Sequence, residues 1–177
     1  MGGPEGVVAE DLGLPALNAL PAPDAARVLA ACCAAPRWVS AVAAGRPYAS
    51  PEQLYAAADD ALADLDEDDV SRALEGHPRI GERAEGAGGA WSRREQSGVS
   101  GAEASTLRAL ADGNLSYEAK FGQVYLVCAS GRSAEVLLAV LRQRLRNDPE
   151  TERAVVRREL GLINRIRLAR LVEETAA

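Results

Sequence analysis

The chain contains a single histidine, His77, which is followed directly by Pro78. A proline fixes its own φ angle and pushes the residue before it toward an extended conformation, so we expect His77 to project from a stiff segment between helices. Because the ordinary pKa of histidine is about 6.5, an imidazole held in this way suits proton transfer near neutral pH. The alternative is a histidine that only closes the turn by hydrogen bonding, since most loop residues are not catalytic.

A second candidate is the pair Ser92 and Glu95, which is followed by Gln96. A Ser-x-x-Glu spacing is typical of a capping box, in which two side chains satisfy backbone N–H groups at the start of a helix. Such a helix start would also offer free N–H groups and a positive dipole to an anionic substrate. Glu95 follows His77 by 18 residues, so any pairing of the two depends on tertiary structure. The spacing alone favours the capping interpretation.

The charge balance argues against a nucleic-acid-binding protein. The 177 residues carry a net charge of −6, whereas phosphate neutralisation needs concentrated positive charge. Residues 131–177 are rich in arginine, but acidic residues are interspersed among them, as on a solvated and salt-bridged helix face. One arginine of this segment could still project toward a carboxylate ligand in a two-pronged geometry.

The cysteines and the apolar runs exclude several other classes of protein. Cys32, Cys33 and Cys128 have neither the number nor the spacing for a disulfide framework or a zinc site. We interpret them as buried thiols in a reducing compartment. No secretory signal is visible, and no apolar stretch approaches the roughly 20 residues that span a bilayer. We therefore expect a cytoplasmic protein that uses no metal and no nucleotide cofactor and binds neither nucleic acid nor membrane.

The remaining pattern is a succession of helices with recognisable ends. It predicts an all-α fold, a single-domain helical bundle of about seven to nine helices with short loops. Residues 1–12 are rich in glycine and acidic residues and are expected to be loosely ordered, while residues 13–177 are expected to form the domain.

Helix signals in the first half of the chain are clear at three places. Asp24 is predicted to cap a helix over residues 24–35. Ser50 followed by Pro51 and Gln53 predicts another helix start, because serine caps, proline fits the first turn and glutamine completes a capping box. A short acidic helix over residues 67–75 is predicted to end at Gly76.

The second half of the chain contains four further start signals, at Ser100 with Glu103, at Asn114, at Ser133 and at Asp148. The dipeptide at residues 112–113, Asp-Gly, is predicted to end the helix that begins at Ser100. Asn114 is then expected to cap a short helix that ends near Phe121. Residues 124–128 form the one strand-like run, and leucines at helical spacing indicate a helix over residues 133–146.

Taken together, these motifs resemble one family, the decarboxylases of 2-oxo-4-hydroxy-4-carboxy-5-ureidoimidazoline (OHCU). The matching residues span almost the whole chain, in the order and spacing of the family. They are Leu17-Asn18-Ala19-Leu20, Cys32-Cys33, Arg37-Trp38-Val39, Arg46-Pro47-Tyr48, His77-Pro78-Arg79-Ile80-Gly81-Glu82, Trp91-Ser92, Glu95-Gln96-Ser97-Gly98, Tyr117 through Gly122, Val127-Cys128-Ala129, Gly131-Arg132-Ser133, Arg142 through Asn147, and Ile166-Arg167-Leu168.

The resemblance implies a cofactor-free, all-α decarboxylase, commonly a homodimer, that converts OHCU to (S)-allantoin in urate breakdown. His77 and Glu95 match the catalytic pair. The substrate-binding positions that carry over are Pro78, Ser92, Gln96, Phe121, Leu126, Val127, Cys128, Ala129 and Arg167. The family tends to place more aromatic or apolar residues at positions 123–125, here Gln-Val-Tyr, a departure that concerns the shape of the pocket.

The expected roles follow from the chemistry of the substrate, which carries a carboxylate and a hydroxyl on one carbon beside a C=N bond. We expect His77 to polarise or deprotonate the hydroxyl, and Glu95 to orient His77 and stabilise its charged form. Arg167 would hold a carbonyl or the carboxylate in place. The competing interpretation is a non-catalytic ligand-binding or scaffold module of a purine pathway, which the capping explanation of Ser92 and Glu95 favours. The presence of both catalytic residue types argues against it.

Overall fold

The computed structural model describes residues 12–75, 77–82, 89–99 and 101–172, with the side chains of residues 89–91 left out. The regular elements in these ranges are all helices, which confirms the all-α class. They are α1 (Leu14–Ala19), α2 (Ala22–Cys32), α3 (Pro36–Ala44), α4 (Pro51–Ala63), α5 (Glu67–Glu75), α6 (Gly89–Glu95), the short 3₁₀ turn η1 (Ser97–Val99), α7 (Ala104–Phe121), α8 (Ala134–Arg144) and α9 (Pro149–Val172).

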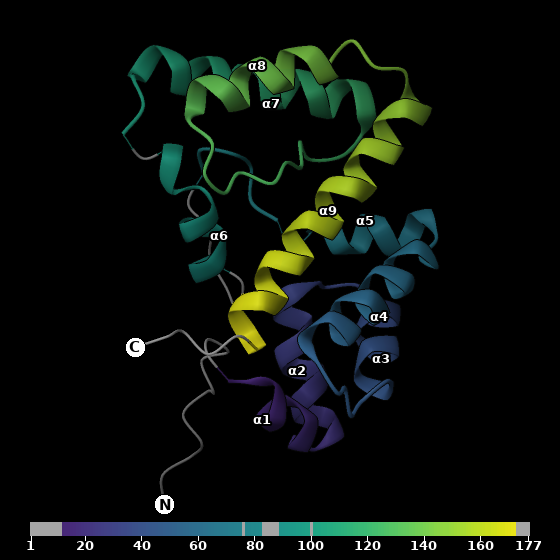
Figure 1. Ribbon diagram of the computed structural model, residues 1–177. Coiled ribbons are helices and arrows are strands. Elements are labelled where there is room, and N and C mark those ends of the chain that lie inside the picture. The colour runs from purple at the N-terminus through teal and green to yellow at the C-terminus, as the bar shows by residue number, and fades with distance from the viewer. Residues whose placement is uncertain (1–11, 76, 83–88, 100, 173–177) are drawn as a thin grey trace, which may run out of the picture.

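The buried apolar residues form two hydrophobic cores, and helix α9 contributes to the first of them. Figure 1 shows it running from the α7 and α8 pair, past α5, to the group formed by α1 to α4. It packs against α1, α2 and α4, where its apolar residues complete the first core with the side chains of α1 to α5. The second core lies between α7, α8 and the segment that connects them. The single expected domain is thus built around two clusters of buried side chains.

Several helix ends in the first half of the chain are explained by single side chains. The Ser50 hydroxyl accepts a hydrogen bond from the N–H of Gln53, which confirms the predicted start of α4. Asp24 is not a cap, because α2 begins earlier, at Ala22, and Asp24 lies in its first turn. This helix ends at Cys32, short of the predicted end at residue 35, and α3 begins after a break. The predicted stop at Gly76 lies outside the described residues.

The predicted break at residues 112–113 is wrong, because α7 is continuous from Ala104 to Phe121. Glycine inside a helix costs up to about 1 kcal/mol relative to alanine, and the packing against α8 explains its presence. A Cβ atom at Gly113 would lie 2.5 Å from a methyl group of Leu141. The bare backbone therefore lets α7 and α8 approach closely. Asn114 is buried inside α7, and its amide donates to the Ile80 carbonyl. Ser100, which was predicted to start this helix together with Glu103, lies outside the described residues.

The last two helices begin at the predicted residues. Ser133 accepts from the N–H of Val136 at the start of α8. Asp148 accepts from the N–H groups of Glu150 and Thr151 at the start of α9. Both caps satisfy N–H groups that have no partner within the helix.

The strand-like run is extended but pairs with no neighbouring strand in the described chain. Its side chains nevertheless alternate as in a strand: Leu126 and Cys128 belong to the first core, while Tyr125, Val127 and Ala129 belong to the second. This segment therefore separates the two cores and contributes to both. The described helices include none that is long and apolar enough to cross a bilayer.

Candidate active site

The imidazole of His77 lies just beyond the end of α5. Its Nδ1 atom is 3.0 Å from the carbonyl oxygen of Ala73, in the last turn of that helix. Since a carbonyl can only accept, Nδ1 carries the proton and Nε2 keeps its lone pair. The Nε2 atom is buried and has no hydrogen-bond partner. His77 therefore presents a basic nitrogen that no protein group occupies.

Burial and a neighbouring cation keep this imidazole neutral. Loss of hydration lowers the pKa of His77 from 6.5 to about 4, and the positive charge of Arg167 acts in the same direction. The hydrogen bond to the Ala73 carbonyl opposes this shift. At neutral pH the residue is thus in its basic form.

Glu95 is buried and is held by Arg167 in a two-pronged ion pair. The Nε and Nη2 atoms of Arg167 lie 2.9 Å from Oε1 and Oε2 of Glu95, respectively. The Nη2 atom also lies 3.3 Å from the Ser92 hydroxyl, while Nη1 donates to the carbonyl oxygens of Ala31 and Cys32 at the end of α2. Three segments that are distant in sequence, α2, α6 and α9, therefore meet at one guanidinium.

This geometry overturns the capping interpretation of Ser92 and Glu95. Helix α6 begins at Gly89, so Ser92 lies within it and not at its start. Both side chains instead contact Arg167. The spacing of three residues places them on the same face of the helix, which is the face turned toward α9.

The amide of Gln96 fixes the segment that carries His77. Its Oε1 atom accepts from the N–H of Gly81, and its Nε2 atom donates to the carbonyl of Arg79. The end of α6 is thereby tied to the residues that follow His77 and Pro78. This contact positions the imidazole relative to Glu95.

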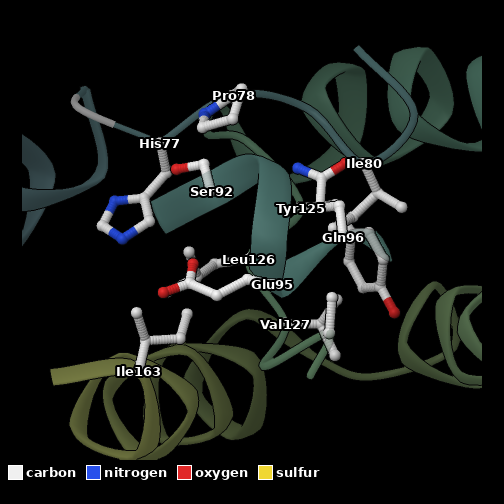
Figure 2. Close-up of a pocket in the computed structure, with 11 residues that line it drawn as sticks. His77, Pro78, Ile80, Ser92, Glu95, Gln96, Tyr125, Leu126, Val127 and Ile163 are labelled. Atoms are coloured by element: carbon white, nitrogen blue, oxygen red, sulfur yellow. The ribbon is translucent and has the colours of Figure 1, made fainter. Parts of the chain in front are cut away.

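These residues enclose a small cavity of about 20 Å³, which is room for about one water molecule. Figure 2 shows the His77 imidazole and the Glu95 carboxylate projecting into it, with Ser92 beside them. Eight predicted site residues line it, namely His77, Pro78, Ser92, Glu95, Gln96, Leu126, Val127 and Ala129. A substituted imidazoline needs more room than this volume offers.

Three predicted binding residues do not line this cavity. Arg167 lies behind Glu95, Cys128 points into the first core, and Phe121 packs on Tyr117 in the second core. The sequence analysis missed three other lining residues, Ile80, Tyr125 and Ile163. Ile80 belongs to the histidine motif and Ile163 stands one turn before Arg167 on α9, so proximity to those residues was a usable signal.

A larger and more open hollow of about 430 Å³ adjoins the cavity, with His77 and Pro78 in the walls of both. Arg79 and Glu118 form a two-pronged ion pair at this hollow, with N–O distances of 2.6 and 2.8 Å. The described residues contain no group of three or more His, Cys, Asp or Glu side chains placed to hold a metal ion.

The backbone of the cavity wall is held by buried charged side chains. The Nη1 atom of Arg144 donates to the Leu126 carbonyl at 2.6 Å, and Glu159 accepts from the Cys128 N–H at 3.0 Å. Arg144 is itself paired with Glu152. A buried backbone group without a hydrogen-bond partner would be costly. These side chains provide the partners that a neighbouring strand would provide in a sheet.

The chain is similar in sequence to known proteins of one family. The family model described as OHCU decarboxylase matches residues 18–169. A bifunctional uric acid degradation protein of Arabidopsis thaliana is 31% identical over 150 residues, which are 82% of this chain and 46% of that protein. The chain thus spans just under half the length of this relative. The OHCU decarboxylase of Amia calva is 29% identical over 142 residues, 78% of this chain and 81% of that protein.

The fold is also similar to that of solved structures. A crystal structure of an OHCU decarboxylase, determined in the presence of (S)-allantoin, superposes with a TM-score of 0.72 at 28% identity, covering 80% of this chain and 94% of the other. An (S)-allantoin synthase superposes with a TM-score of 0.70 at 17% identity, over 91% of this chain and 54% of that one, and shares the fold. Because the family model matches most of the chain, including the residues that line the cavity, this chain belongs to the OHCU decarboxylase family.

Proposed function

We propose that this chain catalyses the decarboxylation of OHCU to (S)-allantoin in urate degradation, with His77 and Glu95 as catalytic residues. The observation that carries the proposal is the imidazole of His77, which lines the same small cavity as the Glu95 carboxylate and whose Nε2 atom has no hydrogen-bond partner. A base with a free lone pair and a fixed carboxylate are the two groups that the reaction needs. Family membership adds the substrate.

The proposed reaction begins when Nε2 of His77 accepts the proton of the substrate hydroxyl. The bond from C4 to the carboxylate breaks and CO₂ leaves. The electron pair of that bond forms a C4=C5 bond, while the π pair of the former C=N bond moves onto its nitrogen. That nitrogen and C5 each gain a proton, one returned by the imidazolium and one from solvent, as the C4 carbonyl forms. Protonation of C5 on a single face gives one enantiomer of allantoin.

Glu95 would stabilise the imidazolium that exists during this sequence, because a carboxylate near a developing positive charge lowers its energy in a buried site. The two-pronged bond to Arg167 keeps the carboxylate oriented and leaves it no freedom to rotate away. The ring of the substrate itself accepts the electron pair, so we expect turnover to persist after treatment with a metal chelator.

The experiment follows circular dichroism while OHCU is generated in situ from urate, with and without the protein. Spontaneous decay yields racemic allantoin, so an accelerated decay that leaves a lasting optical signal supports the proposal. His77→Asn and Glu95→Gln should each abolish this acceleration. Asp59→Asn is the matched control, since it replaces a carboxylate in an exposed two-pronged pair with Arg165. A folded wild-type protein that leaves the decay unchanged and racemic would refute the proposal.

The family resemblance also leads us to propose a homodimer that acts in the cytoplasm. Sedimentation equilibrium at micromolar concentration tests the first point, with a mass of twice the monomer as the expected result. A monomer at these concentrations would contradict it.

A further inference from the structure

The cation nearest to Glu95 has no donor left for a substrate. Each of the three nitrogen atoms of Arg167 already has a protein partner: Glu95 for Nε, Glu95 and Ser92 for Nη2, and two carbonyls of α2 for Nη1. A guanidinium carries five N–H groups, and these five contacts account for all of them. Binding a substrate carboxylate through Arg167 would therefore break a contact that holds Glu95.

A second arginine of α9 is placed differently. Arg170 follows Arg167 by three residues and therefore lies on the same face of the helix. Its Nη1 atom lies 3.7 Å from Oε1 of Glu95, beyond the usual length of a hydrogen bond. That atom is buried and has no hydrogen-bond partner. A buried N–H donor without an acceptor is costly, so the position of this atom beside Glu95, a residue of the cavity wall, requires an explanation.

The charge balance of the site explains the position of Arg170. The imidazole of His77 is neutral at pH 7, and the charges of Glu95 and Arg167 cancel. Without another cation, an anionic substrate would meet the Glu95 carboxylate in surroundings of no net charge, and the two negative charges would repel each other. Arg170 gives the group around Glu95 a net positive charge.

We propose that Arg170 is a specificity-determining residue whose Nη1 atom, which lacks a hydrogen-bond acceptor, receives the carboxylate of the substrate beside Glu95. The inference rests on the proposed function and adds the residue that distinguishes the charged substrate from its uncharged product. CO₂ leaves as a neutral molecule, and protonation neutralises the negative charge that stays on the ring. The attraction to Arg170 therefore disappears when the reaction is complete.

The test compares Arg170→Gln and Arg170→Lys with Arg165→Gln, a control on the same helix whose guanidinium pairs with Asp59 at the surface. In Arg170→Gln, KM for OHCU should rise about 10- to 100-fold, the range expected for a lost hydrogen bond between charged groups. The kcat value and the inhibition constant of (S)-allantoin should stay within about threefold of the wild type. Arg170→Lys should recover part of the loss, and Arg165→Gln should resemble the wild type.

Two results would overturn the inference. One is an unchanged KM in Arg170→Gln. The other is an equal loss of affinity for OHCU and for (S)-allantoin, which would indicate a change of cavity shape. If Arg170→Gln fails to fold, the lysine variant decides. A rise in KM for OHCU without a matching rise in the inhibition constant of (S)-allantoin supports the inference, and an equal rise in both overturns it.

Failure of the proposed function can be recognised separately. If the wild type shows no turnover, calorimetry with hydantoin-5-acetate and with uncharged hydantoin replaces kinetics. The inference then expects tighter binding of the carboxylate by the wild type and loss of that preference in Arg170→Gln. Equal binding of the two rings by the wild type would refute it.

Discussion

Replacing His77 should change how the stability of the protein depends on pH. In the folded protein the pKa of His77 is about 4, against 6.5 for an exposed imidazole. Between these values the unfolded chain binds a proton that the folded chain rejects, so the free energy of unfolding falls as the pH is lowered. His77→Asn removes the titrating group, and its amide can still donate to the Ala73 carbonyl.

The size of the effect follows from the two pKa values. At about pH 5 an imidazole with a pKa of 6.5 is almost fully protonated, whereas one with a pKa near 4 is largely neutral. With about 1.4 kcal/mol for each pKa unit, this difference corresponds to roughly 2 kcal/mol at pH 5 and rises to about 3 kcal/mol well below pH 4. At about pH 7.5 both states are neutral and the contribution is close to zero.

The assay is urea unfolding of the wild type and of His77→Asn, followed by the far-ultraviolet helix signal at about pH 7.5 and pH 5. Other groups that titrate in this range are present in both proteins, so their effects cancel in the comparison. The wild type should lose roughly 2 kcal/mol more than the variant. Equal losses in the two proteins, or a larger loss in the variant, would show that the imidazole is not buried in its neutral form.

Three other outcomes are expected. The kcat/KM value of the wild type should hold as the pH falls below 6.5, and its decline should centre near the low pKa of His77; a midpoint at 6.5 in a pH–rate profile would contradict this. Arg167→Met should lower the free energy of unfolding by about 3–5 kcal/mol, because it removes the two-pronged partner of the buried Glu95 carboxylate and leaves only the more distant Arg170. Adding Glu95→Met should restore part of the loss in thermal unfolding, and no recovery would mean that packing around α9 dominates. Gly98→Ala should lower the free energy of unfolding by about 1–3 kcal/mol in chemical denaturation, because a Cβ there would overlap the backbone carbonyl of Arg132. Unchanged stability would show that the backbone around η1 can shift to make room.

The helix ends were predictable where one side chain decides them locally. Ser50, Ser133 and Asp148 each cap the helix that follows, since the bonds involved join residues two or three apart. The single histidine was identified for a similar reason, because a proline constrains its immediate neighbour. Signals of this kind require no knowledge of the rest of the fold.

Errors arose where a distant segment provides the partner. Ser92 and Glu95 have the spacing of a cap, but Arg167, more than 70 residues further along the chain, supplies a stronger interaction. Gly113 follows an aspartate, as in many turns, yet it lies inside α7, where the side chain of Leu141 from α8 leaves no room for a Cβ atom. A local pattern cannot distinguish these cases, because the deciding atom belongs to another helix.

The segment over residues 124–128 shows how a local sequence pattern and distant partners together determine the structure. Its alternating side chains satisfy two cores at once, which requires an extended backbone, but no strand is present in the described chain to pair with it. Arg144 and Glu159 bind the backbone instead, at Leu126 and Cys128. Because side chains pin this wall from α8 and α9, a shift of either helix would move the wall of the cavity. The shape of the cavity therefore depends on the positions of α8 and α9, through the hydrogen bonds that these helices make to the extended backbone.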